Sequence, residues 1–593
     1  MTVWQACSKE RAVLRGLFLA ALNCLAATML ISFSVNGQQQ LQGQVNAQLP
    51  WQKGVVDKDG RLLAWYHPEQ NLGYDKVLHL GWDFIEHKVP NDRRTGTGLK
   101  IYLINAVFDD KTLQGTYWQH NPAMVFGSFV DSLVGWYPYS GDEEAIQTVR
   151  SMLDHILAHG TTPADWNWAS VPFATSCDDQ ADYGRCIQDM PKTFYGGIET
   201  DKVGELGIGY ALFYEMSGER KYLEAAVHCA DALAKHVRPG DDDHTPWPFR
   251  VDGRTGKVLA GEEYGGIVAS SLRLFDELIR LNEGDADNYR KAGAKAWAWL
   301  RDHPLDPGSK AYDKWSGYFE DVPKNPKNVN QAAPTYTAYY ILSRTDPRAI
   351  DPDWAKHVSH LIDWVRRSLG RGPFYGAWGV DEQGEAPSYR GCCSPVGLGS
   401  DTSRWAAINA LYYEKTRDSQ ARENAFRSLN YATYFAAADG KISCCGEGSM
   451  GLYWFSTWAF VQLFHHIIHG EGLGGGQYWF SDGYSDYLRH FNWAMGAIPE
   501  LAPVGQNHLL QTSTVVQRVQ YGERSLHYWT FDKDGTEVLR LAYRPARVTA
   551  GSQFLGQRDD LAGEGYTIES LPGGDYVVRI RHMQSSEVEV KGK

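Results

Sequence analysis

Residues 201–237 read DKVGELGIGYALFYEMSGERKYLEAAVHCADALAKHV, and this stretch decides the fold. Its first part, 201–216, is mostly apolar and carries glycines where another helix must come close. After the turn SGER, the second part, 220–237, keeps apolar residues on one face and charges on the other. The two patterns predict a buried helix followed by a half-exposed helix, joined as a hairpin.

The same hairpin pattern occurs six times along the chain. Its turns carry glycine as a helix stop and acidic residues in the next first turn, where the helix dipole favours them. A repeat of this length cannot bury its apolar face alone, so six hairpins predict a mainly α, (α/α)6 toroid. The predicted pairs are 122–140 with 143–158, 201–216 with 220–237, 262–282 with 287–302, 331–344 with 352–369, 402–416 with 419–437, and 449–469 with 484–495.

The last part of the chain has a different period. After about residue 500, apolar and polar residues alternate between Gly- and Asp-containing turns such as DKDG and LPGGD. This pattern is typical of antiparallel strands and predicts a small C-terminal β-sandwich over 506–593. The toroid is then expected over 38–505, with 50–110 as a lead-in that closes the ring.

The N-terminus reads as an export signal. Lys9, Arg11 and Arg15 precede an apolar run over 16–33, and small residues follow it. Residues 1–37 are therefore predicted to be a signal peptide, and the mature protein to be secreted or periplasmic. A retained membrane anchor is the alternative, because the run is almost long enough to span a bilayer.

The amino-acid composition limits the classes of molecule that the protein is expected to bind. The net charge of −13 argues against nucleic acid or an anionic membrane, both of which reward basic patches. Aromatic residues make up 13% of the chain, with 21 Trp, and many lie in loops between helices. Aromatic faces stack on the apolar faces of sugar rings, so a poly- or oligosaccharide is the expected partner. The predicted substrate-binding residues are Trp136, Glu199, Trp247, Tyr264, Trp315, Tyr336, Trp378, Arg404 and Tyr453. The oligomeric state stays open.

With its six hairpins and aromatic loops, the chain resembles the six-hairpin glycosidase superfamily and the toroidal polysaccharide lyases over about 80–500. The resemblance is one of architecture. It implies that active-site residues lie in the loops before the inner helices, around a funnel. It also implies an enzyme that acts on carbohydrate, without naming the reaction.

Glycoside hydrolysis needs two carboxyl groups that flank one bond, and the entrances to the predicted inner helices are rich in them. Glu205 lies within an otherwise apolar, Gly-containing helix, where a carboxylate is costly unless it is paired or functional. A structural salt bridge is the alternative for Glu205, and a helix-terminal charge is the alternative for Asp201. The predicted catalytic residues are Asp201, Glu205, Glu262, Glu263 and Glu447. The favoured reading is a glycoside hydrolase.

Two other readings remain open. A polysaccharide lyase or epimerase would remove a proton next to a uronate with Tyr or His, and Tyr336 and Tyr453 lie at suitable places. A non-catalytic glycan-binding protein would use the aromatic loops alone. The carboxylate-rich entry loops favour hydrolysis over both.

The cysteines bear on the export prediction. Cys177 and Cys186 bracket a short polar loop and are predicted to form a disulfide. Two vicinal pairs, Cys392–Cys393 and Cys444–Cys445, are each expected just before an inner helix. Disulfides between neighbouring loops are the favoured interpretation, and a zinc site is the alternative.

The stretch CCSP at 392–395, with Arg404 beyond it, resembles the CC-x-P stretch of the β-L-arabinofuranosidase family. That resemblance implies zinc held by cysteines and a glutamate, with one cysteine as nucleophile. Only Cys392 and Cys393 match, because the preceding inner helix lacks the Glu-x-Cys that the family carries. No cofactor is therefore expected on the favoured reading, and zinc only on this alternative.

Overall fold

The computed structural model describes residues 54–89, 91, 99–100, 105–109, 115–119, 122–174, 196–259, 263–265, 267–315, 329–380, 383–384, 399–436, 478–480 and 484–593. Within these ranges, no helix combines the length and the apolar character needed to cross a membrane. The predicted export segment, 1–37, and the predicted disulfide between Cys177 and Cys186 lie outside the described residues.

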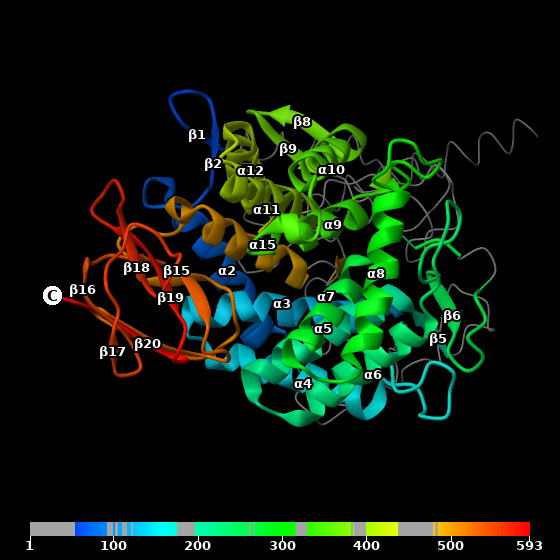
Figure 1. Ribbon diagram of the computed structural model, residues 1–593. Helices are drawn as coiled ribbons and strands as arrows, with labels where there is room; N and C mark the ends of the chain where they lie inside the picture. The colour runs from blue at the N-terminus through cyan, green and yellow to red at the C-terminus, as the bar shows by residue number, and fades with distance from the viewer. Residues whose placement is uncertain are drawn as a thin grey trace, which may run out of the picture.

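The helices form a closed ring of two layers (Figure 1). Six described helices contact one another in the order α3, α5, α7, α9, α11 and α15, and α15 contacts α3 again, so this inner layer closes on itself. Five outer helices, α4, α6, α8, α10 and α12, each pack against the inner helix that precedes them. Helix α2 packs against α15 in the same way. The fold is therefore an (α/α)6 toroid.

The inner helices are α3 (Pro122–Ser140), α5 (Thr200–Ser217), α7 (Ala269–Leu281), α9 (Ala332–Leu342), α11 (Gly399–Thr416) and α15 (Tyr484–Ala497). The outer helices are α2 (Leu72–Asp83), α4 (Glu143–His159), α6 (Arg220–His236), α8 (Ala286–Asp302), α10 (Trp354–Leu369) and α12 (Ser419–Ala432). Shorter turns flank them: η1 (Pro68–Gln70), η2 (Phe84–Lys88), η5 (Pro347–Ala349), η6 (Thr433–Phe435) and η7 (Pro499–Leu501).

The sixth hairpin differs from its prediction. Residues 484–495 were expected to return as an outer helix, yet α15 lies in the inner layer between α11 and α3. Its outer partner is α2, which comes from the lead-in. The predicted inner helix 449–469 lies outside the described residues. The error arises because α15 carries charged residues that pair inside the ring, which gives it the polar pattern of an outer helix.

Glycines let α5 approach both of its inner neighbours. A Cβ atom on Gly209 would lie 3.2 Å from the Cα atom of Gly127 in α3. On the side of α7, a Cβ atom on Gly204 would lie 2.7 Å from the backbone nitrogen of Ser271. The small residues in 201–216 are therefore the packing surface that the sequence indicates.

Substituting Gly204→Ala is expected to destabilise the protein by about 1–2 kcal/mol, because the added methyl group overlaps backbone that cannot move freely. The measurement is chemical denaturation followed by circular dichroism. The matched control is Gly293→Ala in outer helix α8, where the nearest atoms lie 3.8 Å from the added Cβ. There the better helix propensity of Ala is expected to raise stability by up to about 1 kcal/mol. Equal effects at the two positions would contradict tight α5–α7 packing.

Two antiparallel sheets form the predicted C-terminal sandwich. One has the strand order β12-β15-β19-β18 and the other β13-β14-β20-β16-β17. In β14 buried and less buried residues alternate, and Leu526 and Tyr528 are fully buried opposite Val590 and Val588. The strands are β12 (His508–Thr512), β13 (Val516–Gly522), β14 (Ser525–Thr530), β15 (Gly535–Leu541), β16 (Pro545–Ala550), β17 (Gln553–Phe554), β18 (Gly565–Ser570), β19 (Tyr576–His582) and β20 (Glu587–Gly592).

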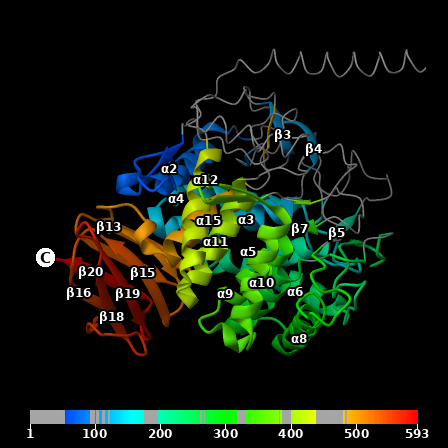
Figure 2. The ribbon, with the colours of Figure 1, turned by 90° about the horizontal axis from the view of Figure 1, so that it is seen from above.

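The sandwich lies at the carboxyl ends of the inner helices. Strands β12 and β13 contact α3, and Gln517 donates a hydrogen bond of 2.7 Å to the carbonyl of Glu215 in α5. Figures 1 and 2 both show the sandwich, in red, on one side of the helices and β5, which precedes α5, on the other. One end of the ring is therefore covered by strands, and the opposite end carries β5 and the other described residues that lead into the inner helices.

Short strands belong to these connections and to the lead-in. They pair as β1 with β2, β5 with β6, β7 with β10 and β8 with β9, and β3 lies between β11 and β4. Their bounds are β1 (Val55–Val56), β2 (Leu62–Leu63), β3 (Asn105–Asp109), β4 (Gly115–Gln119), β5 (Gly197–Glu199), β6 (Arg250–Asp252), β7 (Val329–Asn330), β8 (Gly370–Phe374), β9 (Ala377–Val380), β10 (Gln383–Gly384) and β11 (Tyr478–Phe480).

Candidate active site

The amino-terminal end of the inner helices is the end that can hold a site. Only two residues separate α3 from α4, α5 from α6, and α11 from α12, so the opposite end has little chain to build with. Long connections precede the inner helices, and the first turns of those helices carry buried polar side chains. The candidate active site is therefore placed on the axis of the ring at this end, where these buried polar side chains lie, and we call this region the lumen.

Helix α5 contributes two carboxylates to this lumen. Asp201 lies in its first turn and Glu205 one turn later, on the same face of the helix. Glu205 is 5% exposed and accepts a hydrogen bond of 3.0 Å from the hydroxyl of Ser128 in α3. Asp201 is 7% exposed and accepts the backbone N–H of Lys202 at 2.9 Å. Both carboxylates are thus held by short contacts and nearly removed from water.

The pKa of Asp201 is raised to about 6. Burial is the largest cause, and the negative charges of Glu199 and Glu205 add to it. The ammonium group of Lys202, 3.4 Å from Asp201, acts in the opposite direction but does not outweigh them. Asp201 is therefore about half protonated near pH 6, and about a tenth of the molecules keep this proton at pH 7.

The opposite wall carries a cationic group. Because α11 is the third inner helix from α5 in either direction around the ring, Arg404 of α11 lies across the lumen from α5. Arg404 forms ion pairs with Asp401, at 3.2 Å, and with Asp486 of α15. Its guanidinium also lies 5.0 Å from the ring centre of Tyr336 in α9. Three inner helices thus meet at this one arginine.

An ion-pair layer, formed by Asp131, Arg273, Asp486 and Arg489, closes the lumen below. Arg489 bonds to Asp131 at 2.8 Å and to Asp486, and it donates a hydrogen bond of 2.7 Å to the Tyr336 hydroxyl. Asp131 also receives both nitrogens of Arg273, at 2.8 and 2.9 Å. Burial opposes the charge on Asp131, but the two guanidiniums outweigh it and lower the pKa of this carboxyl.

One histidine lies beside the ion-pair layer. His490 is fully buried, and its Nδ1 atom lies 2.8 Å from the hydroxyl of Ser403. Burial and the nearby charges of Arg489 and Arg404 lower its pKa well below the usual value. His490 is therefore a neutral imidazole at ordinary pH.

Four of the predicted site residues lie in the amino-terminal halves of inner helices, at this end of the ring: Asp201 and Glu205 on α5, Tyr336 on α9 and Arg404 on α11. Glu199 lies next to them on β5 but is committed to Arg250, whose Nε atom is 2.5 Å from its carboxylate. The structure thus gathers residues from the second, fourth and fifth predicted hairpins.

The prediction of a tryptophan platform at the rim is wrong for three residues. The side chains of Trp136, Trp247 and Trp315 are 1–4% exposed and so present no free face to a sugar. Trp136 lies near the carboxyl end of α3 and donates its indole N–H to Asp142 at 2.9 Å. Trp247 donates to the Leu233 carbonyl at 2.8 Å. Trp136 and Trp247 are therefore core residues whose N–H groups are satisfied locally, while the buried Trp315 has no acceptor for its N–H among the described residues.

Three further predictions fall outside the lumen. Trp378 lies on β9 in a groove between α10 and α12, on the outer side of the ring, with Arg366 5.4 Å from its ring centre. Tyr264 is 4% exposed and donates its hydroxyl to the Lys314 carbonyl at 2.8 Å. Glu263 pairs with Arg238 at 2.7 Å. Each of these contacts holds its side chain within a loop or at a helix end.

The remaining predicted residues lie outside the described part of the chain. They are Glu262, Glu447, Tyr453, Cys392, Cys393, Cys444 and Cys445. The disulfide and zinc interpretations of the cysteines therefore stay predictions. Among the residues that the structure describes, no cluster of three or more His, Cys, Asp or Glu side chains is arranged to hold a metal ion.

Sequence reasoning missed Asp131, Asp486 and Arg489. Asp131 is a lone charge in the apolar stretch PAMVFGSFVDSLVGW, the same signal that pointed to Glu205. Asp486 and Arg489 stand three residues apart among aromatic residues, a spacing that allows an ion pair on one helix face. Both signals were present, but the second lay in a helix that was expected on the outside.

Comparisons with known proteins concern the fold. No protein-family model matches the chain, and neither does any curated protein. A sugar epimerase from a ruminal bacterium is similar in structure, with 10% identity, 71% of this chain and 99% of its own chain covered, and a TM-score of 0.47. A D-mannose isomerase has 11% identity, 74% and 99% coverage, and a TM-score of 0.47. An α-mannanase of Bacteroides thetaiotaomicron has 10% identity, 73% and 98% coverage, and a TM-score of 0.43.

These three proteins are named for three different reactions on sugars, so likeness at this level does not select a chemistry. The closed ring of alternating inner and outer helices itself assigns the chain the (α/α)6 toroid fold.

Proposed function

We propose that the protein is a glycoside hydrolase that cleaves a poly- or oligosaccharide in the lumen of the ring. One observation carries the proposal: a buried carboxyl, Asp201, whose pKa is raised to about 6, lies one helical turn from a second buried carboxylate, Glu205. Glycoside hydrolysis uses such a pair, one protonated and one ionised.

The two carboxyl groups take different roles. Asp201, the group with the raised pKa, donates its proton to the leaving glycosidic oxygen. Glu205, oriented by the Ser128 hydroxyl, acts on the sugar carbon, directly or through a water molecule. Tyr336 and Arg404, on the far wall, contact the sugar hydroxyls. Asp486 and Arg489 position Tyr336 and Arg404 through the contacts already described.

The pH profile of kcat/KM is expected to have a limb on its alkaline side, on which kcat/KM falls as the pH rises. The acid must carry its proton, so activity falls as the pH rises through about 6, by about tenfold per pH unit well above that value. Lys202 lowers the pKa of Asp201, so Lys202→Met should raise it and move the limb to higher pH. If the limb of Lys202→Met stays at the same pH while its circular dichroism spectrum is unchanged, the limb does not arise from Asp201.

A specific observation favours a second candidate, a polysaccharide lyase or epimerase. The Tyr336 hydroxyl accepts a hydrogen bond from Arg489 at 2.7 Å, and the Arg404 guanidinium lies 5.0 Å from its ring centre. A phenol held beside two cations is placed as a tyrosine base that removes a proton next to a uronate would be. The carboxylates of Asp401 and Asp486 already neutralise much of this charge, which is why hydrolysis is the first proposal.

The deciding experiment screens the purified protein against a panel of polysaccharides. New reducing ends without ultraviolet absorbance would support hydrolysis. New reducing ends with the absorbance of an unsaturated uronate would favour the lyase and overturn the first proposal. Epimerisation would change sugar composition without new reducing ends. The absence of any product would leave a glycan-binding protein as the remaining reading.

The N-terminal segment bears on the cellular compartment in which the protein acts. We propose that residues 1–37 direct export, so that the substrate is met outside the cytoplasm. Expression of the full chain with N-terminal sequencing of the exported product tests this. An uncleaved protein in the membrane fraction would support the anchor instead.

A further inference from the structure

The far end of the ring holds a cavity that the proposed reaction does not use. It lies between the carboxyl-terminal halves of the inner helices and the segment 510–515 of the sandwich, and its volume is about 260 Å³. Ser343 and Ser513 at its edge are exposed, so it reaches solvent. Ligand pockets for drug-sized molecules start at roughly 300 Å³, so this one suits a single small molecule.

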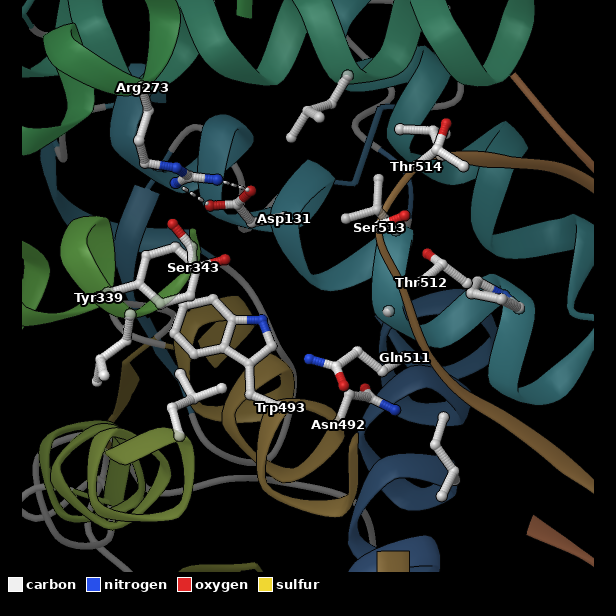
Figure 3. A pocket seen from close by; sticks show the side chains of 18 of the residues that line it. Asp131, Arg273, Tyr339, Ser343, Asn492, Trp493, Gln511, Thr512, Ser513 and Thr514 are labelled. Carbon is white, nitrogen blue, oxygen red and sulfur yellow. Dashed lines mark hydrogen bonds and ion pairs between the residues drawn. The ribbon is translucent and has the colours of Figure 1, made fainter. Parts of the chain in front are cut away.

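The ion-pair layer separates this cavity from the candidate active site. Asp131 and Arg273 line the cavity, while Asp486 and Arg404 lie on the active-site side. Figure 3 shows the Asp131–Arg273 pair on one wall, Trp493 and Tyr339 on a second, and Thr512 with Thr514 on a third. All six inner helices and strand β12 contribute residues to this space, which is distinct from the candidate active site.

Two buried side chains on the cavity wall carry polar atoms that lack partners within the part of the chain that the structure describes, although the other carboxyl oxygen of Glu215 accepts from Arg280. Asn492 is 2% exposed, and neither its amide nitrogen nor its amide oxygen makes a hydrogen bond. Glu215 has a side chain that is 1% exposed, and its Oε1 atom has no partner. An unsatisfied buried polar group is costly, so such groups in a native protein call for a partner that occupies the space beside them.

The aromatic wall also offers a donor. Trp493 and Tyr339 stack face to face, with ring centroids 4.0 Å apart, and the Arg489 guanidinium lies 5.1 Å from the centre of the Trp493 ring. The indole edge is therefore what Trp493 presents, and Figure 3 shows its nitrogen turned towards the open space. Thr512, half-buried on β12, adds a hydroxyl on the opposite wall.

The charges on the wall balance. Asp131 pairs with Arg273, and Glu277 pairs with Arg280. Burial and the neighbouring Glu277 raise the pKa of Glu215 to about 10, so Glu215 is a neutral acid. Glu414 and Lys415 add one acidic and one basic group, so the wall has no large excess of either charge, and a neutral molecule with several hydroxyl groups could use the amide, carboxyl and indole groups at once.

From these contacts we infer a second binding site at this end of the ring, for a neutral polyhydroxylated molecule of monosaccharide size. The ligand accepts from the Trp493 indole, exchanges hydrogen bonds with both atoms of the Asn492 amide, and reaches Thr512 on the sandwich. Because it touches both the ring and the sandwich, it also ties the two together. The site does not depend on the proposed hydrolase activity.

The test titrates the full-length protein with D-glucose, D-mannose and D-galactose separately, by calorimetry or saturation-transfer NMR. At least one sugar is expected to bind. Asn492→Leu, close to Asn in size, should weaken that binding about tenfold or more, since two hydrogen bonds are lost. Thr512→Val, on the opposite wall and away from the lumen, should weaken it about 2- to 10-fold. The matched control is Asn288→Leu on outer helix α8, which should bind as the unmodified protein does.

The variants are expected to fold. The Asn492 amide has no partner among the described residues, so Asn492→Leu should melt at the same temperature as the unmodified protein, or higher. Binding unchanged in both Asn492→Leu and Thr512→Val would place the sugar elsewhere, in the active site for example, and overturn the inference. Binding of none of the three sugars would overturn it as well.

Discussion

If the protein is the proposed hydrolase, Asp201→Asn is expected to lower kcat on its polysaccharide substrate by about 10²–10⁴-fold, the range that a positioned general acid contributes. Asn has the same shape as Asp but cannot give up a proton to the leaving oxygen. The buried position of Asp201 makes replacement by a solvent acid difficult. The variant should also lose the basic limb of the pH profile. Initial rates of reducing-end formation across a pH series measure both effects.

Substrates with different leaving groups distinguish the proposed roles of Asp201 and Glu205. An aryl glycoside with an acidic phenol needs little protonation, so Asp201→Asn should recover much of its activity on that substrate. Glu205→Gln should lose activity on both substrates, because its role at the sugar carbon does not depend on the leaving group. Equal losses for Asp201→Asn on both substrates would contradict its assignment as the acid.

A matched control is Asp287→Asn on outer helix α8, a carboxylate with a side chain that is 82% exposed. It should keep full activity. Glu263→Gln adds a second comparison, because the sequence pointed to Glu263 while the structure pairs it with Arg238. If Glu263→Gln loses activity while Asp201→Asn keeps it, the general acid lies in the loop before α7 and not on α5.

The sequence predicts the repeat well because the repeat is local. A buried helix, a glycine turn and an amphipathic helix are visible in 201–237, and the structure forms α5 and α6 there. The period change after about residue 500 likewise predicts the sandwich strands. Where the prediction fails, at α15, the charges that face inwards have partners on other helices. A sequence shows a charged residue but not the partner that allows it to be buried.

The same limit explains why the sequence pointed to Glu205 but misplaced the tryptophans. Glu205 was found because a carboxylate in an apolar helix is conspicuous, whether it is functional or paired. The tryptophans were misplaced because an indole N–H finds its acceptor through tertiary contacts, as Trp136 does at Asp142 and Trp247 at the Leu233 carbonyl. Composition indicates that aromatic surface is plentiful, but only packing decides which rings keep a free face.

Arg489→Met is expected to destabilise the protein by about 3 kcal/mol, because it removes a buried cation from two buried carboxylates. The side chain of Arg489 is 1% exposed, and it bonds to Asp131, Asp486 and the Tyr336 hydroxyl. Each carboxylate keeps one other arginine, Arg273 or Arg404, so the loss falls at the low end of the range for a broken buried pair. Chemical denaturation, followed by circular dichroism, gives the value.

The matched control makes the same change on the surface. Arg290 pairs with Asp287 on α8, where both side chains are more than half exposed. Arg290→Met should cost less than about 1 kcal/mol, as exposed ion pairs do. Equal effects of Arg290→Met and Arg489→Met would show that the ion-pair layer adds nothing to stability beyond an ordinary surface contact.

The pH dependence of the stability difference between the unmodified protein and Arg489→Met tests whether the buried carboxylates cause this difference. The Arg273 and Arg489 guanidiniums lower the pKa of Asp131 against the effect of burial. A carboxyl with a lowered pKa stabilises the folded state above its unfolded pKa of about 3.9, and this contribution is lost as the pH falls. The stability gap between the unmodified protein and Arg489→Met should therefore narrow as the pH is lowered through the acid range.

Such a result would explain how the ring closes. Arg489 of α15 reaches α3 through Asp131 and α9 through Tyr336, while Asp131 reaches α7 and Asp486 reaches α11. One network thus joins five of the six inner helices at a single level of the lumen. Apolar packing alone would let neighbouring helices slide or the ring open between α15 and α3, whereas a fixed set of ion pairs is satisfied only when the last helix meets the first. The layer that supports the active site from below is then also the layer that closes the fold.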